Sequence, residues 1–106
     1  MLRIVDEIVA LIREVAPVAV RIGRQDAGLA KQFRDALTSA ALNASEGSGQ
    51  HGARRTNHYA IALGSADEAF VALKAAVAWG YVERIDAGVA DKFDKIVRTL
   101  NKVARA

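Results

Sequence analysis

Apolar side chains recur at helical spacing in four stretches of the 106-residue chain. The stretches at about 2–22, 27–46 and 55–79 each place their apolar residues three or four positions apart, which gathers them on one side of a helix. The fourth stretch follows Asp86 and ends near 104, with apolar positions at Val89, Phe93, Ile96, Leu100 and Val103. Four amphipathic helices joined by short connections predict an all-α fold, an antiparallel up-and-down four-helix bundle that takes in residues 1–106 as one domain.

A proline interrupts the first of these helical patterns. The expected buried positions in this helix are Ile4, Ile8, Leu11, Val15, Val18 and Ile22. Pro17 lacks a backbone N–H and crowds the preceding turn, so we expect a kink or a break there, or a new turn that begins at Pro17. Residues 23–28 are then expected to connect the first two helices, with Asp26 capping the second.

Composition narrows the class of protein. Alanine, the best helix former, is abundant, and there is no cysteine for disulfide or thiolate chemistry. No apolar run reaches the roughly 18 residues that span a bilayer. Charged residues also interrupt the N-terminal apolar stretch, where a signal peptide would have none. We therefore expect a soluble, cytoplasmic protein.

The net charge of +3 comes entirely from the C-terminal segment. Residues 1–83 hold nine basic and nine acidic side chains, whereas residues 84–106 hold six basic and three acidic ones. On the last helix the basic residues lie off the apolar side, at Lys92, Lys95, Arg98, Lys102 and Arg105. A basic face of this kind predicts contacts with the phosphate backbone of RNA or DNA.

The stretch "EGSGQHGARR", residues 46–55, has the G-x-G-x-x-G spacing of a dinucleotide-binding fingerprint. That fingerprint follows a buried strand, whereas an alanine-rich helix precedes these glycines. We therefore interpret the stretch as the turn between the second and third helices. Arg54 and Arg55 come near the start of the third helix, where free N–H groups favour anions. They are candidate phosphate contacts; a solvated loop is the alternative.

No constellation of residues predicts catalysis, a metal site or a cofactor. His51 and His58 lack the further ligands of a metal motif, and no serine has a nucleophile-elbow motif around it. Asn43 lies on the apolar side of its helix, so it must find polar partners, and Glu46 on the same face is expected to join it. Gly64 and Ser65 lie inside the third helix, and the expected reason for the glycine is close packing of another helix over the missing side chain.

Three short motifs, taken together, point to a family. They are an Asn-x-x-Glu-Gly, an Ala-x-Gly-Ser followed by an acid, and a Gly-Tyr, formed here by Asn43, Glu46, Gly47, Ala62, Gly64, Ser65, Glu68, Gly80 and Tyr81. Over residues 29–82 the chain resembles the bacterial four-helix-bundle proteins first noticed in intervening sequences of large-subunit ribosomal RNA genes. The accessory variability determinant of diversity-generating retroelements is similar to these proteins.

This resemblance implies an up-and-down bundle that assembles as a homopentameric ring and has no enzymatic activity. In the retroelement branch it implies binding of nucleic acid and of a reverse transcriptase. The segment "ARRTNHYA" at 53–60 departs from the family pattern, and the connection between the first two helices looks longer. The partnership with a reverse transcriptase is therefore not carried over to this chain.

The first helix has more apolar residues than one buried side requires, which independently suggests a subunit interface. The additional positions are Val5, Val9, Ile12, Ala16, Ala19 and Val20. The sequence thus predicts a non-enzymatic, ring-forming bundle that acts as a nucleic-acid-binding accessory or adaptor protein. The alternative is a purely structural or protein-interaction module with no nucleic-acid role.

Overall fold

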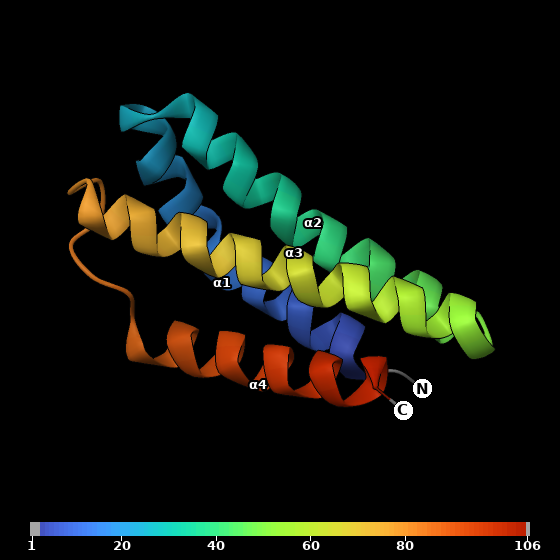
Figure 1. Ribbon diagram of the computed structural model, residues 1–106. Helices are drawn as coiled ribbons and strands as arrows, with labels where there is room; N and C mark the ends of the chain where they lie inside the picture. Colours follow the sequence, from blue (N-terminus) through green and yellow to red (C-terminus); the bar gives the residue numbers. More distant parts are fainter. Residues whose placement is uncertain (1–2, 106) are drawn as a thin grey trace.

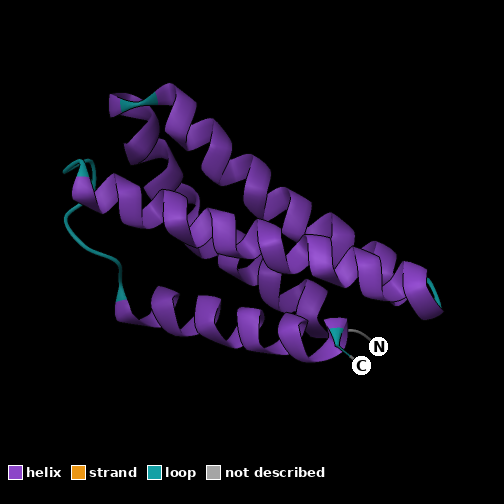
Figure 2. Ribbon diagram, in the orientation of Figure 1, coloured by secondary structure: helices purple, strands orange, loops and turns teal. Residues whose placement is uncertain are grey.

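The computed structural model describes residues 3–105, which form four helices joined by short segments (Figure 1). The helices are α1 (Arg3–Gln25), α2 (Ala27–Ser48), α3 (Gly52–Ala78) and α4 (Ala87–Ala104). The described residues contain no strand (Figure 2), which confirms the all-α prediction with four helices. The predicted start of the first helix at Leu2 lies outside the described residues.

One hydrophobic core holds the helices together. α2 packs most extensively against α3, and the pairs α1–α2, α3–α4 and α1–α4 also contact each other. The largest fully buried side chains come from all four helices and include Ile8, Phe33, Tyr59 and Phe93. Alanines supply much of the contact surface on α2 and α3, so their backbones approach closely. The end of α4 and the start of α1 lie at the end of the molecule where α2 turns into α3 (Figure 1).

Helix α1 continues through Pro17 without a break. The proline is exposed, and in Figure 1 the C-terminal half of α1 leans toward the start of α2. Beyond the proline the buried position is Ala19, and the predicted Val18 is only half-buried. The next buried residue after Val15 is therefore four positions later, at Ala19, and not three positions later, at Val18. This difference rotates the buried side of the second half of the helix.

The connection between α1 and α2 is a single residue, so the prediction of a loop over 23–28, and of a long connection, is wrong. Helix α1 runs to Gln25, and the backbone N–H of Asp26 still donates to the carbonyl of Ile22 at 2.8 Å. The Asp26 side chain then accepts from the N–H of Leu29 at 2.9 Å, which confirms Asp26 as the N-cap of α2. Asp26 thus ends α1 through its backbone N–H and starts α2 through its carboxylate, so no further residues are needed to turn the chain.

Replacing Asp26 with alanine is expected to destabilise the fold by about 1 kcal/mol, because the N-cap hydrogen bond is lost. The Tyr81 hydroxyl, which donates to Asp26 at 3.3 Å, loses its partner as well. Chemical denaturation at one fixed chain concentration measures the change. Asp26→Asn is the control, since asparagine caps helices equally well. Equal losses for both variants would show that capping is not what Asp26 contributes.

Helix α3 ends at a glycine in the left-handed conformation. Gly80 has a φ of +82°, and its N–H donates to Val77 while that of Tyr81 donates to Ala76, each at 2.9 Å. This pair of hydrogen bonds is a Schellman motif, which needs the left-handed conformation that glycine adopts without strain. Tyr81 then stacks on Trp79, with ring centroids 6.5 Å apart. Gly80 and Tyr81 therefore act in ending the helix and in holding the α1–α2 joint.

Candidate nucleic-acid interface

Two of the predicted phosphate contacts on α4 are paired with acids of α1. Lys92 forms an ion pair with Glu14, and the Nζ of Lys95 lies 3.3 Å from Oε1 of Glu7. Such exposed pairs contribute at most about 1 kcal/mol each to stability. The two acids nevertheless neutralise the charges of the two lysines. These lysines therefore hold α4 against α1, and a phosphate would have to displace their acidic partners.

The C-terminal half of α4 carries the remaining basic residues. Arg98 pairs with Asp94 one turn earlier, with its Nε 3.0 Å from Oδ2. Lys102 and Arg105 are exposed and take part in no ion pair within residues 3–105. They also lie in the last turn and at the C-cap of α4, where the helix dipole favours positive charge.

The start of α3 holds the other two predicted contacts. Helix α3 begins at Gly52, three residues before the predicted Arg55; Gly52 has a φ of +59° and follows an extended His51, so the chain changes direction there. His51 makes no side-chain cap hydrogen bond, so it leaves N–H groups of the first turn to other partners. Arg54 is exposed, and the guanidinium of Arg55 lies 5.0 Å from the centre of the Tyr59 ring in a cation–π contact.

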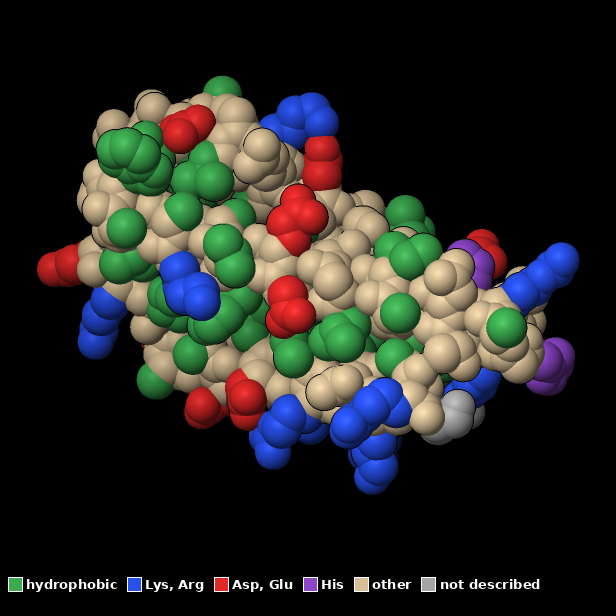
Figure 3. Space-filling model, in the orientation of Figure 1, with side chains coloured by type: hydrophobic (Ala, Val, Ile, Leu, Met, Phe, Trp, Pro, Cys, Tyr) green, Lys and Arg blue, Asp and Glu red, His purple; other side chains and the backbone are tan. Residues whose placement is uncertain are grey.

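The fold brings these two groups to one end of the molecule. Figure 1 shows the start of α3 at the end where α4 finishes, and Figure 3 shows lysine or arginine and histidine side chains there. We call Arg54, Arg55, Lys102 and Arg105 the basic end. None of the four forms an ion pair within the described residues. Lys92, Lys95 and Arg98 lie earlier in α4, and each is paired with an acidic residue, so they are not part of the basic end.

The polar residue predicted on the buried side of α2 has its partners, but not the one expected. Asn43 donates through Nδ2 to the carbonyl and the hydroxyl of Ser39, at 3.0 and 3.2 Å. Its Oδ1 lies 3.1 Å from Nδ1 of His58. Since the amide oxygen can only accept, Nδ1 of His58 carries a hydrogen. Glu46 is exposed and does not bond to Asn43, so the predicted Asn43–Glu46 pair is wrong.

This network joins α2 to α3 along their half-buried edge. The hydroxyls of Ser39 and Ser65 lie 2.9 Å apart, which gives Ser65 of the predicted motif a structural role. His58 was missed as a member. Its separation of seven residues from Ser65 places both on one side of α3, and that spacing was the available signal. Polar contacts between helices, here half-buried, fix how the two helices align.

Gly47 is needed for close packing between α2 and α3. It lies inside α2, one residue before the helix ends, and it is buried. A Cβ atom at Gly47 would lie 2.9 Å from Cε1 of Tyr59, which is closer than atoms can approach without movement. The Tyr59 ring thus packs directly on the α2 backbone, and its hydroxyl is buried with no hydrogen-bond partner among the described residues.

Gly64 has no such role within the subunit, because no helix of the described chain packs closely over it. The residue is exposed, and a Cβ atom added there would meet nothing within 4 Å. Helix α3 is already covered by α2 and α4 on its other sides. The glycine therefore faces outward from the bundle.

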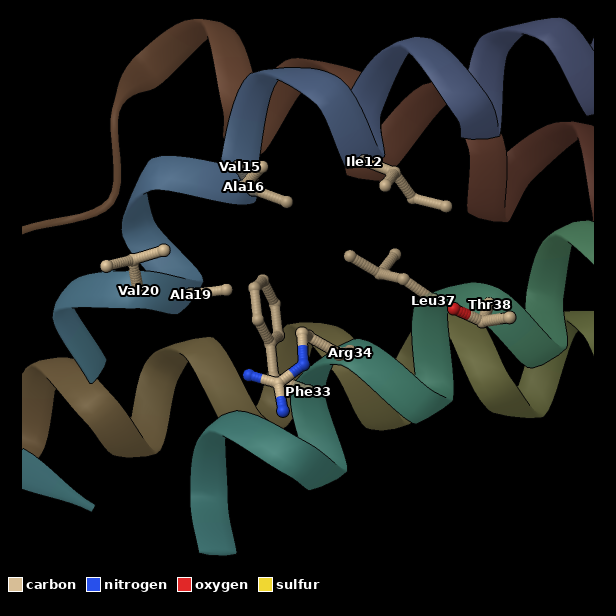
Figure 4. Close-up of a pocket in the computed structure, with 9 residues that line it drawn as sticks. All are labelled: Ile12, Val15, Ala16, Ala19, Val20, Phe33, Arg34, Leu37 and Thr38. Carbon is tan, nitrogen blue, oxygen red and sulfur yellow. The ribbon is translucent and has the colours of Figure 1, made fainter. Parts of the chain in front are cut away.

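An apolar groove lies between α1 and α2 (Figure 4). It encloses about 260 Å³, and its lining residues are Ile12, Val15, Ala16, Ala19, Val20, Phe33, Arg34, Leu37 and Thr38. Small-molecule sites are larger, roughly 300–1,000 Å³, and hold several convergent polar groups. Arg34 and Thr38 are the polar members here, and both are exposed. The groove therefore suits apolar side chains better than a substrate.

The Tyr81 hydroxyl lies beside the carboxylate of Asp26 at the α1–α2 joint. Partial burial, and then the neighbouring Asp26 carboxylate, raise the pKa of the Tyr81 hydroxyl above its ordinary value.

Within residues 3–105, no three side chains able to bind a metal ion come together, and no helix is long and apolar enough to cross a membrane. Neither the groove nor the basic end presents an acid, base and nucleophile to one point.

The chain was compared with known proteins in three ways. A scan against protein-family models, a search of curated proteins and a search of solved structures each returned no match.

Proposed function

We propose that the chain is a non-enzymatic, cytoplasmic helical bundle that self-assembles and binds nucleic-acid backbones through its basic end. It would act there as an accessory or adaptor protein. The helices are proposed to run antiparallel, up and down, and the connections of one and three residues support this arrangement. Short connections of this kind join antiparallel neighbours in bundles.

The basic end carries the nucleic-acid part of the proposal. Phosphate oxygens are recognised mainly by arginine, lysine and the N–H groups of helix starts, and all three are present there. Because their charges have no acidic partner within residues 3–105, binding a phosphate breaks no ion pair of the fold. Lys92, Lys95 and Arg98 would first have to leave their acids, so they contribute less.

Removing two charges from the basic end is expected to weaken binding to RNA or DNA and to flatten its salt dependence. The plot of log K against log salt concentration has a negative slope, and each phosphate contact contributes about 0.9 to its magnitude. In the double variant Arg54→Ala/Lys102→Ala, the magnitude of the slope should therefore decrease by about 2. Lys92→Ala/Lys95→Ala removes the same charge from paired positions and should change the slope less. A fluorescence-anisotropy titration across a salt series measures both.

Two outcomes of that titration would contradict the proposal. Equal losses for both double variants would assign binding to overall charge rather than to the basic end. No binding by the unaltered protein, even at low salt, would leave the alternative function of a structural or protein-interaction module. Trp79 favours that alternative, because its ring is 72% exposed and exposed tryptophans often anchor protein partners.

Self-assembly is supported by apolar surface that the subunit does not cover. Val9 and Val20 of α1 are exposed, as the surplus of apolar residues in that helix predicts, and Val20 lines the α1–α2 groove. The proposed assembly is the homopentameric ring that the family resemblance implies. Sedimentation at micromolar concentration tests it, and a monomer there would overturn it.

A further inference from the structure

The outer face of α3 has a row of exposed residues that nothing in the subunit covers. Ile61, Gly64, Glu68 and Val71 follow at spacings of three and four, which places them on one side of the helix. Ile61 is 42% exposed and Val71 is 58% exposed, although both side chains are apolar. Apolar and acidic side chains are visible together in the middle of the molecule, where α3 runs (Figure 3). We call these four residues the α3 stripe.

The glycine in the stripe makes the face suitable for close contact. A glycine inside a helix destabilises it by about 1 kcal/mol relative to alanine. Within the subunit nothing lies near enough to Gly64 to require the missing side chain. A neighbouring surface that approaches the backbone between Ile61 and Val71 would require it. The stripe thus has the composition of a contact face: two apolar side chains, a gap and one charge.

The α1–α2 groove offers a complementary surface. Figure 4 shows Phe33 and Leu37 pointing from α2 toward α1, where they are buried and form the floor of the groove. The apolar side chains open to a partner are the half-buried Ile12 and the exposed Val20, both on α1. Arg34 lies on the groove as an exposed charge and forms no ion pair within residues 3–105. Glu68 of the stripe is likewise without an ion pair in the described chain. Each surface therefore combines an apolar patch with one unpaired charge, and the two charges have opposite signs.

We propose that the α3 stripe of one subunit seats in the α1–α2 groove of a second copy, with Glu68 paired to the Arg34 of that copy. The proposal rests on the self-assembly proposed above and names the surfaces that carry it. The stripe and the groove are different surfaces of one subunit, so the contact is head-to-tail. A pair of copies would still offer one free stripe and one free groove, so the contact can repeat, and it closes into a ring when the rotation allows.

A charge-reversal experiment tests this contact by sedimentation velocity at micromolar concentration. Glu68→Arg alone and Arg34→Glu alone should each weaken association about tenfold or more, because each sets like charges against each other. Glu68→Arg together with Arg34→Glu should restore the wild-type assembly. Asp67→Arg is the matched control, since it reverses the neighbouring exposed charge on the side of α3 toward α4 and should leave assembly unchanged.

A second variant tests the gap in the stripe independently of charge. Gly64→Leu should reduce the assembly to monomers while far-ultraviolet circular dichroism shows undiminished helix content, since the site is open within the subunit. Unchanged assembly in Gly64→Leu, Glu68→Arg and Arg34→Glu would overturn the proposed contact and leave self-assembly standing. Dissociation by both charge reversals without rescue in the combined variant would overturn the Glu68–Arg34 pair. A monomeric wild-type protein would overturn self-assembly and the contact together.

Discussion

Replacing Phe93 with alanine is expected to destabilise the folded subunit by about 3–5 kcal/mol, the largest loss that we anticipate from a single substitution. Helix α4 is attached to the bundle through only four buried residues, Val89, Phe93, Ile96 and Leu100. The Phe93 ring is 1% exposed and lies 5.0 Å from the ring of Phe70 on α3. Truncation therefore removes the largest of the four anchors and leaves a cavity between two helices.

Urea denaturation followed by circular dichroism, at one chain concentration, measures this loss. A fixed concentration is needed because assembly of the folded state adds to apparent stability. Asp94→Ala is the control: it alters the next residue, which is exposed, and removes only a surface ion pair with Arg98. That change should lie within about 0.5 kcal/mol of the wild type. Comparable losses for the two variants would mean that α4 is not held by its buried face.

The second large effect is expected at Gly47, where alanine should destabilise the fold by about 1–3 kcal/mol. The new Cβ would lie 2.9–3.2 Å from three atoms of the Tyr59 ring. That ring is fully buried, so it has little room to move aside. The usual gain from replacing a helical glycine with alanine is about 1 kcal/mol and is smaller near a helix end, so the clash decides the sign.

Gly23→Ala provides the matched comparison for Gly47→Ala. Gly23 is also two or fewer residues from the end of its helix, but a Cβ there would meet Ala30 at an ordinary 3.5 Å. This variant should be neutral or slightly stabilising in thermal denaturation. The effect of Gly47→Ala should also shrink in a Tyr59→Leu background, since the two residues contact each other and their effects are coupled. Equal behaviour of the two glycine variants would show that the ring does not rest on α2.

The sequence predicted the fold best for helices that have a single, clearly apolar side. All four buried residues of α4 were identified from their spacing, and Asp26 was recognised as the cap of α2. The exact helix boundaries were harder to predict. Helix α3 starts at Gly52, before Arg55, and residues 52–54 contain no large apolar side chain from which that start could be predicted.

Tertiary contacts account for the predictions that failed. The glycines at 47 and 64 look alike in sequence, yet one packs under an aromatic ring and the other faces outward. The pairing of Lys92 and Lys95 with α1 depends on which side of α1 faces α4, and spacing within one helix cannot reveal this. For the same reason Asn43 could be expected to need partners, whereas His58 could not be named as the one it finds.

The single-residue joint at Asp26 restricts how the length of this chain can vary. Each added residue turns a helix by about 100°, so an insertion at Asp26 would rotate the buried side of α2 away from α1. The core residues Ile22 and Ala30 lie within one turn of the joint, so no slack exists to absorb the change. The eight residues between α3 and α4 can lengthen at little entropic cost. Insertions and deletions among proteins of this kind should therefore concentrate at 79–86 and avoid the first corner.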